Sequence, residues 1–115
     1  MSTSEIAHLT EVIKVPVTTK SGEQEMLTTR RIDDEKFHLT DSIVHPFTHR
    51  NGDVILYIFK NGLGQDQIGK GKHKQAGMSL PALVGRHYQF GYVNDDMFDI
   101  TPDNLISRRQ KNTFK

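Results

Sequence analysis

The first third of the chain has a pattern of hydrophobic and polar positions that is typical of strands. Residues 11–18 are rich in β-branched side chains with partial alternation, and a turn signal at 20–23 separates them from a second candidate strand at 25–32. Pro16 has no N–H to donate to a sheet ladder, so we expect the first strand to be an edge strand or to end early. The charged residues 33–36 predict a polar break.

The strongest local signal predicts a β-hairpin over residues 43–60. Asn51 and Gly52 stand between two apolar runs, and Asn-Gly suits a two-residue type I′ turn because both central residues need a positive φ. The second run, 54–59, is apolar at every position, which predicts a strand buried on both faces. Residues 61–77 contain five glycines and a basic run, and we expect a flexible, positively charged loop there.

Two helices are predicted near the C-terminal end. Ser79 is a favourable N-cap for a helix at 80–88, with Pro81 in its first turn. Thr101 is the corresponding cap for a helix at 102–111, whose first turn also begins with a proline and carries an acidic residue. The segment between the two helices predicts a strand followed by a loop, or a tight hairpin.

These elements predict a single α+β domain over residues 1–115, with a small antiparallel sheet, hairpins and C-terminal helices. The strand pair and a linker occupy 1–40, and the hairpin, the basic loop and the two helices occupy 41–115. The length is typical of one domain. A content of 35% apolar and 25% charged residues favours a globular chain over a disordered one.

Composition excludes several classes of function. The chain has no cysteine, which rules out disulfides, zinc–thiolate sites and a cysteine nucleophile. No apolar run approaches the roughly 18–20 residues of a membrane span, and the first residues lack the features of a signal peptide. No phosphate-binding glycine motif is present. We therefore expect a cytoplasmic protein with no membrane partner.

Basic charge is concentrated toward the C-terminal end. Residues 1–69 hold seven Lys and Arg against ten Asp and Glu, whereas residues 70–115 hold eight against four. Such an asymmetry is typical of a phosphate-binding surface, and an ordinary solvated surface is the alternative. The candidate nucleic-acid-binding residues are Lys70, Lys72, Lys74, Arg86, Arg108, Arg109 and Lys111.

The same part of the chain resembles a known nuclease motif over about residues 79–112. The resemblance lies in the order of four short runs: Leu83-Val84, Val93-Asn94-Asp95, Pro102-Asp103-Asn104-Leu105 and a later Asn112. This order is similar to that of the HNH, or His-Me finger, nucleases. The resemblance implies a ββα finger in which a His activates water while neighbouring side chains hold one divalent metal for phosphodiester cleavage.

The resemblance also implies that the catalytic groups are missing. Tyr92 stands at the position of the general base, and a phenol with an ordinary pKa near 10 is a poor base at neutral pH. Gly91 stands at the position of a metal ligand and has no side chain. Asn104 matches the Asn that ties the finger's loop to its helix, and Asn112 lies one residue from the expected spacing of the last Asn. We therefore expect a degenerate finger with no catalytic residue.

Other residues offer no substitute metal site. His45 and His49 share a face of the predicted strand but would stand about 13 Å apart, too far to hold one ion. The acidic residues of the C-terminal part lack the loop length and final Glu of an EF-hand, so we expect a solvated acidic loop; they are Asp95, Asp96, Asp99 and Asp103. We predict neither a metal nor a cofactor.

Three hypotheses of function follow. The first is an accessory or regulatory protein on a degenerate HNH-like scaffold, of a size that suits a phage or mobile element. It would bind nucleic acid, chiefly duplex DNA through nonspecific phosphate contacts. The second is an inhibitor or adaptor that binds a host protein through the edge of strand 11–18 or the acidic N-terminal part. The third is a metal-dependent endonuclease. The sequence leaves the oligomeric state open.

Overall fold

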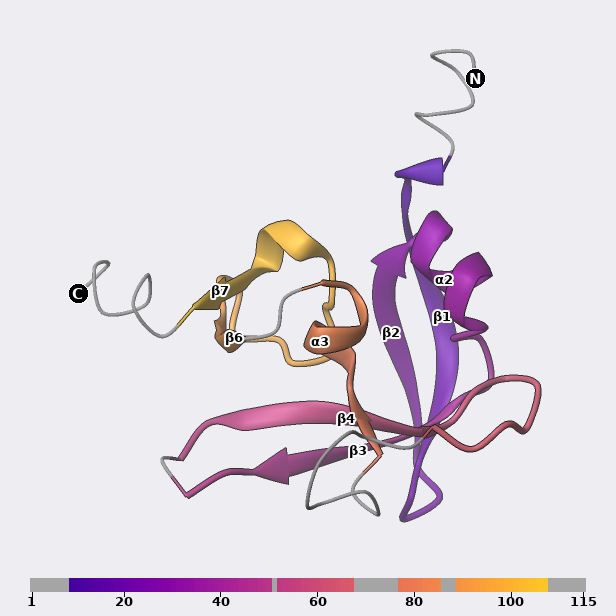
Figure 1. The fold of residues 1–115 in the computed structure, drawn as a ribbon, viewed down its shortest axis with the longest axis horizontal. Helices are drawn as coiled ribbons and strands as arrows, with labels where there is room; N and C mark the ends of the chain where they lie inside the picture. Colours follow the sequence, from indigo (N-terminus) through magenta and orange to yellow (C-terminus); the bar gives the residue numbers. More distant parts are fainter. Residues whose placement is uncertain (1–8, 51, 68–76, 86–88, 108–115) are drawn as a thin grey trace.

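The computed structural model describes residues 9–50, 52–67, 77–85 and 89–107. In these ranges the chain is mixed α+β, with a five-stranded sheet of order β2-β1-β3-β4-β5 and a separate two-stranded pair (Figure 1). The elements are β1 (Val12–Thr19), β2 (Gln24–Arg30), α2 (Arg31–Phe37), β3 (Ile43–Thr48), β4 (Val54–Lys60), β5 (Met78–Ser79), α3 (Leu80–Leu83), β6 (Gln89–Tyr92), the 3-10 helix η2 (Pro102–Asn104) and β7 (Leu105–Ser107).

Three tight turns share one geometry. Each is a three-residue loop whose last residue is a glycine with positive φ, at Gly22 (91°), Gly52 (90°) and Gly64 (77°). The flanking residues are joined by a backbone hydrogen bond in each case: Thr19 N–H to Glu23 O (2.8 Å), His49 N–H to Asp53 O (2.8 Å) and Asn61 N–H to Gln65 O (3.0 Å). A residue with a side chain would be strained at such a φ, which explains why glycine ends all three loops.

The predicted 43–60 hairpin is confirmed, but its turn differs from the expected one. The last strand pair is Thr48 with Val54, and Gly52 N–H donates to His49 O at 2.9 Å. Since His49 and Asp53 are also joined by a backbone hydrogen bond, the loop holds three residues rather than two, and the glycine with positive φ is its last residue. Asn51 itself lies outside the described residues.

The expectation of a flexible loop after β4 is wrong for residues 61–67. The buried Asn61 side chain accepts from the N–H groups of Leu63 and Gln65, both at 3.0 Å, and organises the turn. Gly62 N–H donates to His38 O at 2.7 Å, and a Cβ on Gly62 would collide with the Thr40 carbonyl. The basic run at 70–74 lies outside the described residues.

The five-stranded sheet is mixed rather than antiparallel. β1 pairs with β2 along its length and runs parallel to β3 only at Thr18 and Thr19. The β1–β2 and β3–β4 hairpins therefore meet at a corner and extend in different directions (Figure 1). The prediction that Pro16 confines β1 to an edge is wrong: the Pro16 carbonyl accepts from Asp41 N–H at 2.8 Å, so this residue's backbone faces away from β2 and no β1–β2 bond is lost.

The predicted polar break at 33–36 is part of α2. Asp33 and Asp34 lie in the first turn of this helix, where the helix dipole favours acidic side chains. The Arg30 guanidinium binds the buried Asp33 carboxylate at 2.8 and 3.2 Å, and Asp34 accepts from the N–H and hydroxyl of Thr40, both at 2.8 Å. The charged residues are thus paired, which sequence composition alone did not indicate.

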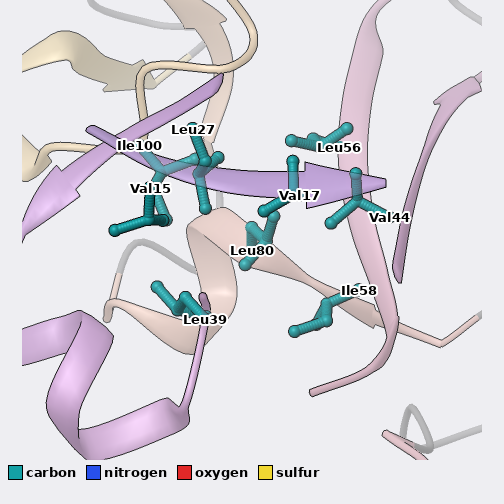
Figure 2. Close-up of a cluster of buried hydrophobic side chains, with 9 residues drawn as sticks. All are labelled: Val15, Val17, Leu27, Leu39, Val44, Leu56, Ile58, Leu80 and Ile100. Atoms are coloured by element: carbon teal, nitrogen blue, oxygen red, sulfur yellow. The ribbon is translucent and has the colours of Figure 1, made fainter. Parts of the chain in front are cut away.

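The core fills the inner angle between the two hairpins. Val15, Val17 and Leu27 come from one hairpin, and three residues of the other hairpin face them. Leu80 of α3 lies in the middle of the cluster (Figure 2), and Leu39 and Ile100 complete it. The buried hydrophobic side chains among the described residues are all Val, Leu or Ile, from Val15 to Leu105.

The predicted burial of β4 on both faces holds only in part, since Ile55 on the outer face is buried (4% exposed) but its neighbours on that face are not. Leu56 and Ile58 point into the core and are fully buried. Tyr57 and Phe59, which alternate with them on the outer face, are only half-buried. The aromatic side chains of this strand therefore lie away from the core.

Both predicted C-terminal helices are wrong in extent. The Ser79 cap is confirmed, since its hydroxyl accepts from Ala82 N–H at 3.3 Å, but α3 ends at Leu83 and Gly85 follows with φ 91°. The predicted helix at 102–111 is a 3-10 turn over Pro102–Asn104, after which Leu105–Ser107 form a strand. This segment forms a strand rather than a helix because it pairs with β6 and buries Leu105. Residues 108–111 lie outside the described part.

Candidate functional site

β6 and β7 form an antiparallel pair that holds the loop 93–104 between them. Tyr92 is the register partner of Leu105, and Gly91 is that of Ile106. Three of the four positions assigned through the finger resemblance thus come together: Gly91 and Tyr92 on β6, and Asn104 where the loop joins β7. The fourth, Asn112, lies outside the described residues.

Asn104 ties the two ends of this loop together. Its side-chain oxygen accepts from Asn94 N–H at 3.0 Å, and its side-chain nitrogen donates to the Asp99 carbonyl at 2.8 Å. Its own carbonyl accepts from Val93 N–H at 2.8 Å. The residue is 7% exposed, so water has little access to these groups. One side-chain amide therefore fixes the path of the nine residues between Asn94 and Asn104.

A second polar group organises the middle of the loop. Both oxygens of the Asp99 carboxylate are bonded within the loop. Oδ1 accepts from the Thr101 hydroxyl (2.6 Å) and Thr101 N–H (3.1 Å), and Oδ2 accepts from the Asn94 side chain (2.8 Å). The Thr101 side chain, predicted to cap a helix, donates its hydrogen bond to this carboxylate instead.

The loop is attached to the main sheet through the outer edge of β2. Thr28 N–H donates to Phe98 O at 2.7 Å, and Ile100 N–H donates to Thr28 O at 2.9 Å. Ile100 is fully buried in the core (Figure 2). Backbone pairing and one apolar anchor thus hold the loop against the domain, and they also cover part of the β2 edge.

Tyr92 lies where the loop meets β4. Its hydroxyl is buried near the Leu56 backbone without a hydrogen bond of good geometry. Burial raises the pKa of Tyr92 from about 10 to about 12; the Leu56 backbone lowers that pKa somewhat, and the Asp96 carboxylate raises it. Tyr92 is therefore a protonated phenol at neutral pH.

The acidic residues of the loop do not converge on one point. Asp95, Asp96 and Asp103 are exposed, and both oxygens of Asp99 are already hydrogen-bonded. Within the described ranges, no group of three or more His, Asp or Glu side chains has the arrangement of a metal site.

The two histidines of the hairpin lie on the outer face of β3–β4 among aromatic rings. His49 Nε2 is 3.2 Å from the Tyr57 hydroxyl, and the His45 ring packs edge-on against Phe59. Sequence reasoning predicted that the histidines share a face but missed the aromatic surface around them. The alternation of aliphatic with aromatic residues along 56–59 was the available signal.

The candidate basic residues all lie outside the described part of the chain: Lys70, Lys72, Lys74, Arg86, Arg108, Arg109 and Lys111. Only their attachment points can be given. Arg86 precedes Gln89 by three residues, and Arg108 directly follows Ser107. Gln89 and Ser107 are register partners, so both basic segments connect to the same end of the β6–β7 pair.

Comparison of the chain with protein-family models, with curated proteins and with solved structures found no match. Among the described helices, none has the length and apolar character needed to cross a bilayer.

Proposed function

We propose that this chain is a nucleic-acid-binding accessory or regulatory protein on an HNH-like ββα scaffold that has lost its catalytic groups. Its C-terminal basic residues would contact the phosphates of duplex DNA with little sequence preference.

The observation that carries this proposal is the role of Asn104. The resemblance implies an Asn that ties the loop of the finger to its helix. The Asn104 side chain bonds to Asn94 N–H at the start of the loop and to the Asp99 carbonyl in its middle, and the loop connects two antiparallel strands. An antiparallel pair with such a loop is two-thirds of a ββα finger. The helix expected to follow it falls on residues outside the described part.

The loss of catalysis is supported by the groups at the two key positions. A general base must be deprotonated near the operating pH, and the pKa of Tyr92 is raised to about 12. Gly91 has no side chain to ligate a metal, and both Asp99 oxygens are engaged elsewhere. These residues leave neither a base nor a ligand on the strand that would carry them in a nuclease.

The topology also favours the basic C-terminal part over the first strand as the binding surface. In sequence, Arg86 lies shortly before Gln89, and Arg108 and Arg109 follow Ser107, so these three residues are attached at one end of the β6–β7 pair. A basic surface formed from that end would suit phosphate binding. The protein-binding hypothesis relied on the edge of strand 11–18 or on the acidic N-terminal part. β1 pairs with β2 along its length and with β3 at Thr18 and Thr19, which leaves less of that edge for a partner.

Duplex binding by matched variants tests the proposal. We expect Arg108→Ala with Arg109→Ala to weaken binding of every duplex sequence about equally. Lys14→Ala with Lys36→Ala removes the same charge from two exposed sites in the acidic part and should have little effect. Equal effects of the two double variants would contradict the proposal. Incubation with magnesium, manganese or zinc should give no cleavage. Turnover that disappears on replacing His45, or His87 five positions before Tyr92 in the sequence, with Ala would show relocated catalytic groups.

A further inference from the structure

The outer face of the β3–β4 hairpin carries side chains of a different kind from the core. Strand alternation directs Val44, Leu56 and Ile58 inward, where all three are fully buried. The opposite face holds the buried Ile55 and, around it, aromatic and imidazole rings: His45, Phe47, His49, Tyr57 and Phe59. Three of these rings belong to Phe or Tyr, whereas the buried cluster is wholly aliphatic.

The rings form one continuous surface. Phe47 lies edge-on to His49 (centroids 5.2 Å apart) and to Tyr57 (5.9 Å), and His45 lies edge-on to Phe59 (6.2 Å). His45 and Tyr57 are direct cross-strand partners, which joins the two groups. The bond between His49 Nε2 and the Tyr57 hydroxyl (3.2 Å) holds two of the rings in a defined orientation.

Part of this surface is accessible to solvent in the described part of the chain. Phe47 is 46% exposed, and the other rings are half-buried. The described helices and the segment 98–100 pack on the inner side, through Leu80, Leu39 and Ile100. A contiguous group of partly exposed rings is uncommon on a protein surface without a binding role, whereas single exposed apolar side chains are ordinary.

The charge around the rings favours an anionic partner. The Lys20 ammonium lies 4.3 Å from the centroid of the Phe59 ring, at the corner where β1 meets β3. Lys20 N–H donates to Val44 O at 3.0 Å, which fixes this residue beside the ring surface. Between residues 43 and 60, Asp53 is the one acidic residue, against Arg50 and Lys60, and the Lys60 ammonium is paired with Asp66 at 3.1 Å.

We propose that the outer face of the β3–β4 hairpin binds single-stranded nucleic acid, with unpaired bases stacking on Phe47 and Tyr57 and with Lys20 beside the phosphate backbone. Aromatic rings interleaved with cations are the combination that binds unpaired strands, because every base has a π face and every linkage carries a charge. In a duplex the base faces are already stacked on one another. The surface therefore selects unpaired strands, and it shares no residue with the proposed duplex-binding surface.

Fluorescence anisotropy with a short labelled oligothymidine at low salt tests this inference on the full chain. Phe47→Leu keeps an apolar side chain but removes the ring, and we expect it to weaken binding about 10-fold. Phe47→Tyr keeps the ring and should bind as the parent does. Met26→Ala is the matched control, since Met26 is 51% exposed on the outer face of β2 and has no ring. Circular dichroism checks that each variant is folded.

The results separate the possible occupants of the face. Equal affinity of the parent and Phe47→Leu, or no binding at low salt, would overturn the inference. Sedimentation equilibrium of the same variants detects a second copy as the occupant: a dimer abolished by Phe47→Leu, without any effect on oligothymidine binding, would also overturn it. Loss of duplex binding in the Arg108 and Arg109 double variant, with oligothymidine binding retained, would show that the two surfaces act independently.

Discussion

The five-stranded sheet and the loop 93–104 are held in shape by different forces. The sheet encloses a cluster of Val, Leu and Ile side chains, most of them fully buried. The loop buries few apolar groups, and its path is fixed by hydrogen bonds of Asn94, Asp99, Thr101 and Asn104. Hydrophobic burial tolerates exchanges of similar volume, whereas a polar network depends on individual donors and acceptors. The loop should therefore be sensitive to small chemical changes that the sheet would tolerate.

The largest expected effect comes from a cavity in the sheet. Leu56 is fully buried, and Leu56→Ala should lower the free energy of unfolding by about 2–5 kcal/mol through lost burial and the cavity left behind. Leu63→Ala is the control, because Leu63 is 62% exposed and its truncation should cost little. Urea unfolding measures both. Similar costs for the two variants would contradict the assignment of Leu56 to the core.

A smaller effect is expected from the polar network. Asn104→Ala leaves Asn94 N–H and the Asp99 carbonyl without their partner, and we expect a loss of about 1–3 kcal/mol. Asn94→Ala removes the exposed asparagine of the same loop, where water can replace the lost bonds, and should cost less. Unfolding by urea and hydrogen exchange at the Asn94 amide measure the difference. If Asn94→Ala lowered the free energy of unfolding more than Asn104→Ala, Asn104 would not be the residue that holds the loop together.

The smallest effect at neutral pH is expected for Tyr92→Phe, which removes a buried hydroxyl that has no good hydrogen bond. Above pH 10 the parent should lose stability, because an unfolded Tyr ionises near pH 10 while the pKa of folded Tyr92 is about 12. Folding then takes up protons, and about 1–2 kcal/mol should be lost between pH 10 and 12 after allowance for partial solvent exposure.

Unfolding at pH 7 and at several values up to pH 12 would test this expectation. Tyr92→Phe should show a weaker alkaline decline than the parent. The pKa of Tyr57 is also raised by burial, so the two proteins share that contribution and their difference isolates Tyr92. Identical pH profiles would show that the Tyr92 hydroxyl is not buried.

The sequence predicted the sheet better than the C-terminal part, for a physical reason. Alternation and glycine turns are local, so the first two strands, the 43–60 hairpin and the Ser79 cap could be found from neighbouring residues. The parallel contact between Thr18 and Ile43, and the position of β1 inside the sheet, depend on residues far apart in the chain.

The errors occurred where distant contacts override local preference. Thr101 and Pro102 are typical of a helix start, but Asp99 binds the Thr101 hydroxyl and β6 pairs with Leu105. The charged residues 33–36 suggested a break, but Arg30 and Thr40 bind the carboxylates of Asp33 and Asp34 within or beside a helix. For the candidate site, the resemblance drew attention to Asn104, whose side chain is hydrogen-bonded within the loop. Nothing local in the sequence indicated that Tyr92 would be buried against β4.

The salt dependence of duplex binding tests the central claim most directly. If Lys and Arg of the C-terminal part contact phosphates, the logarithm of the association constant should fall linearly with the logarithm of salt concentration, because bound counterions are released. Four to six contacts predict a slope of roughly −4 to −5 with micromolar affinity, and the Arg108 and Arg109 double variant should flatten it by up to about 2. A slope near zero, or no binding at low salt, would contradict the claim.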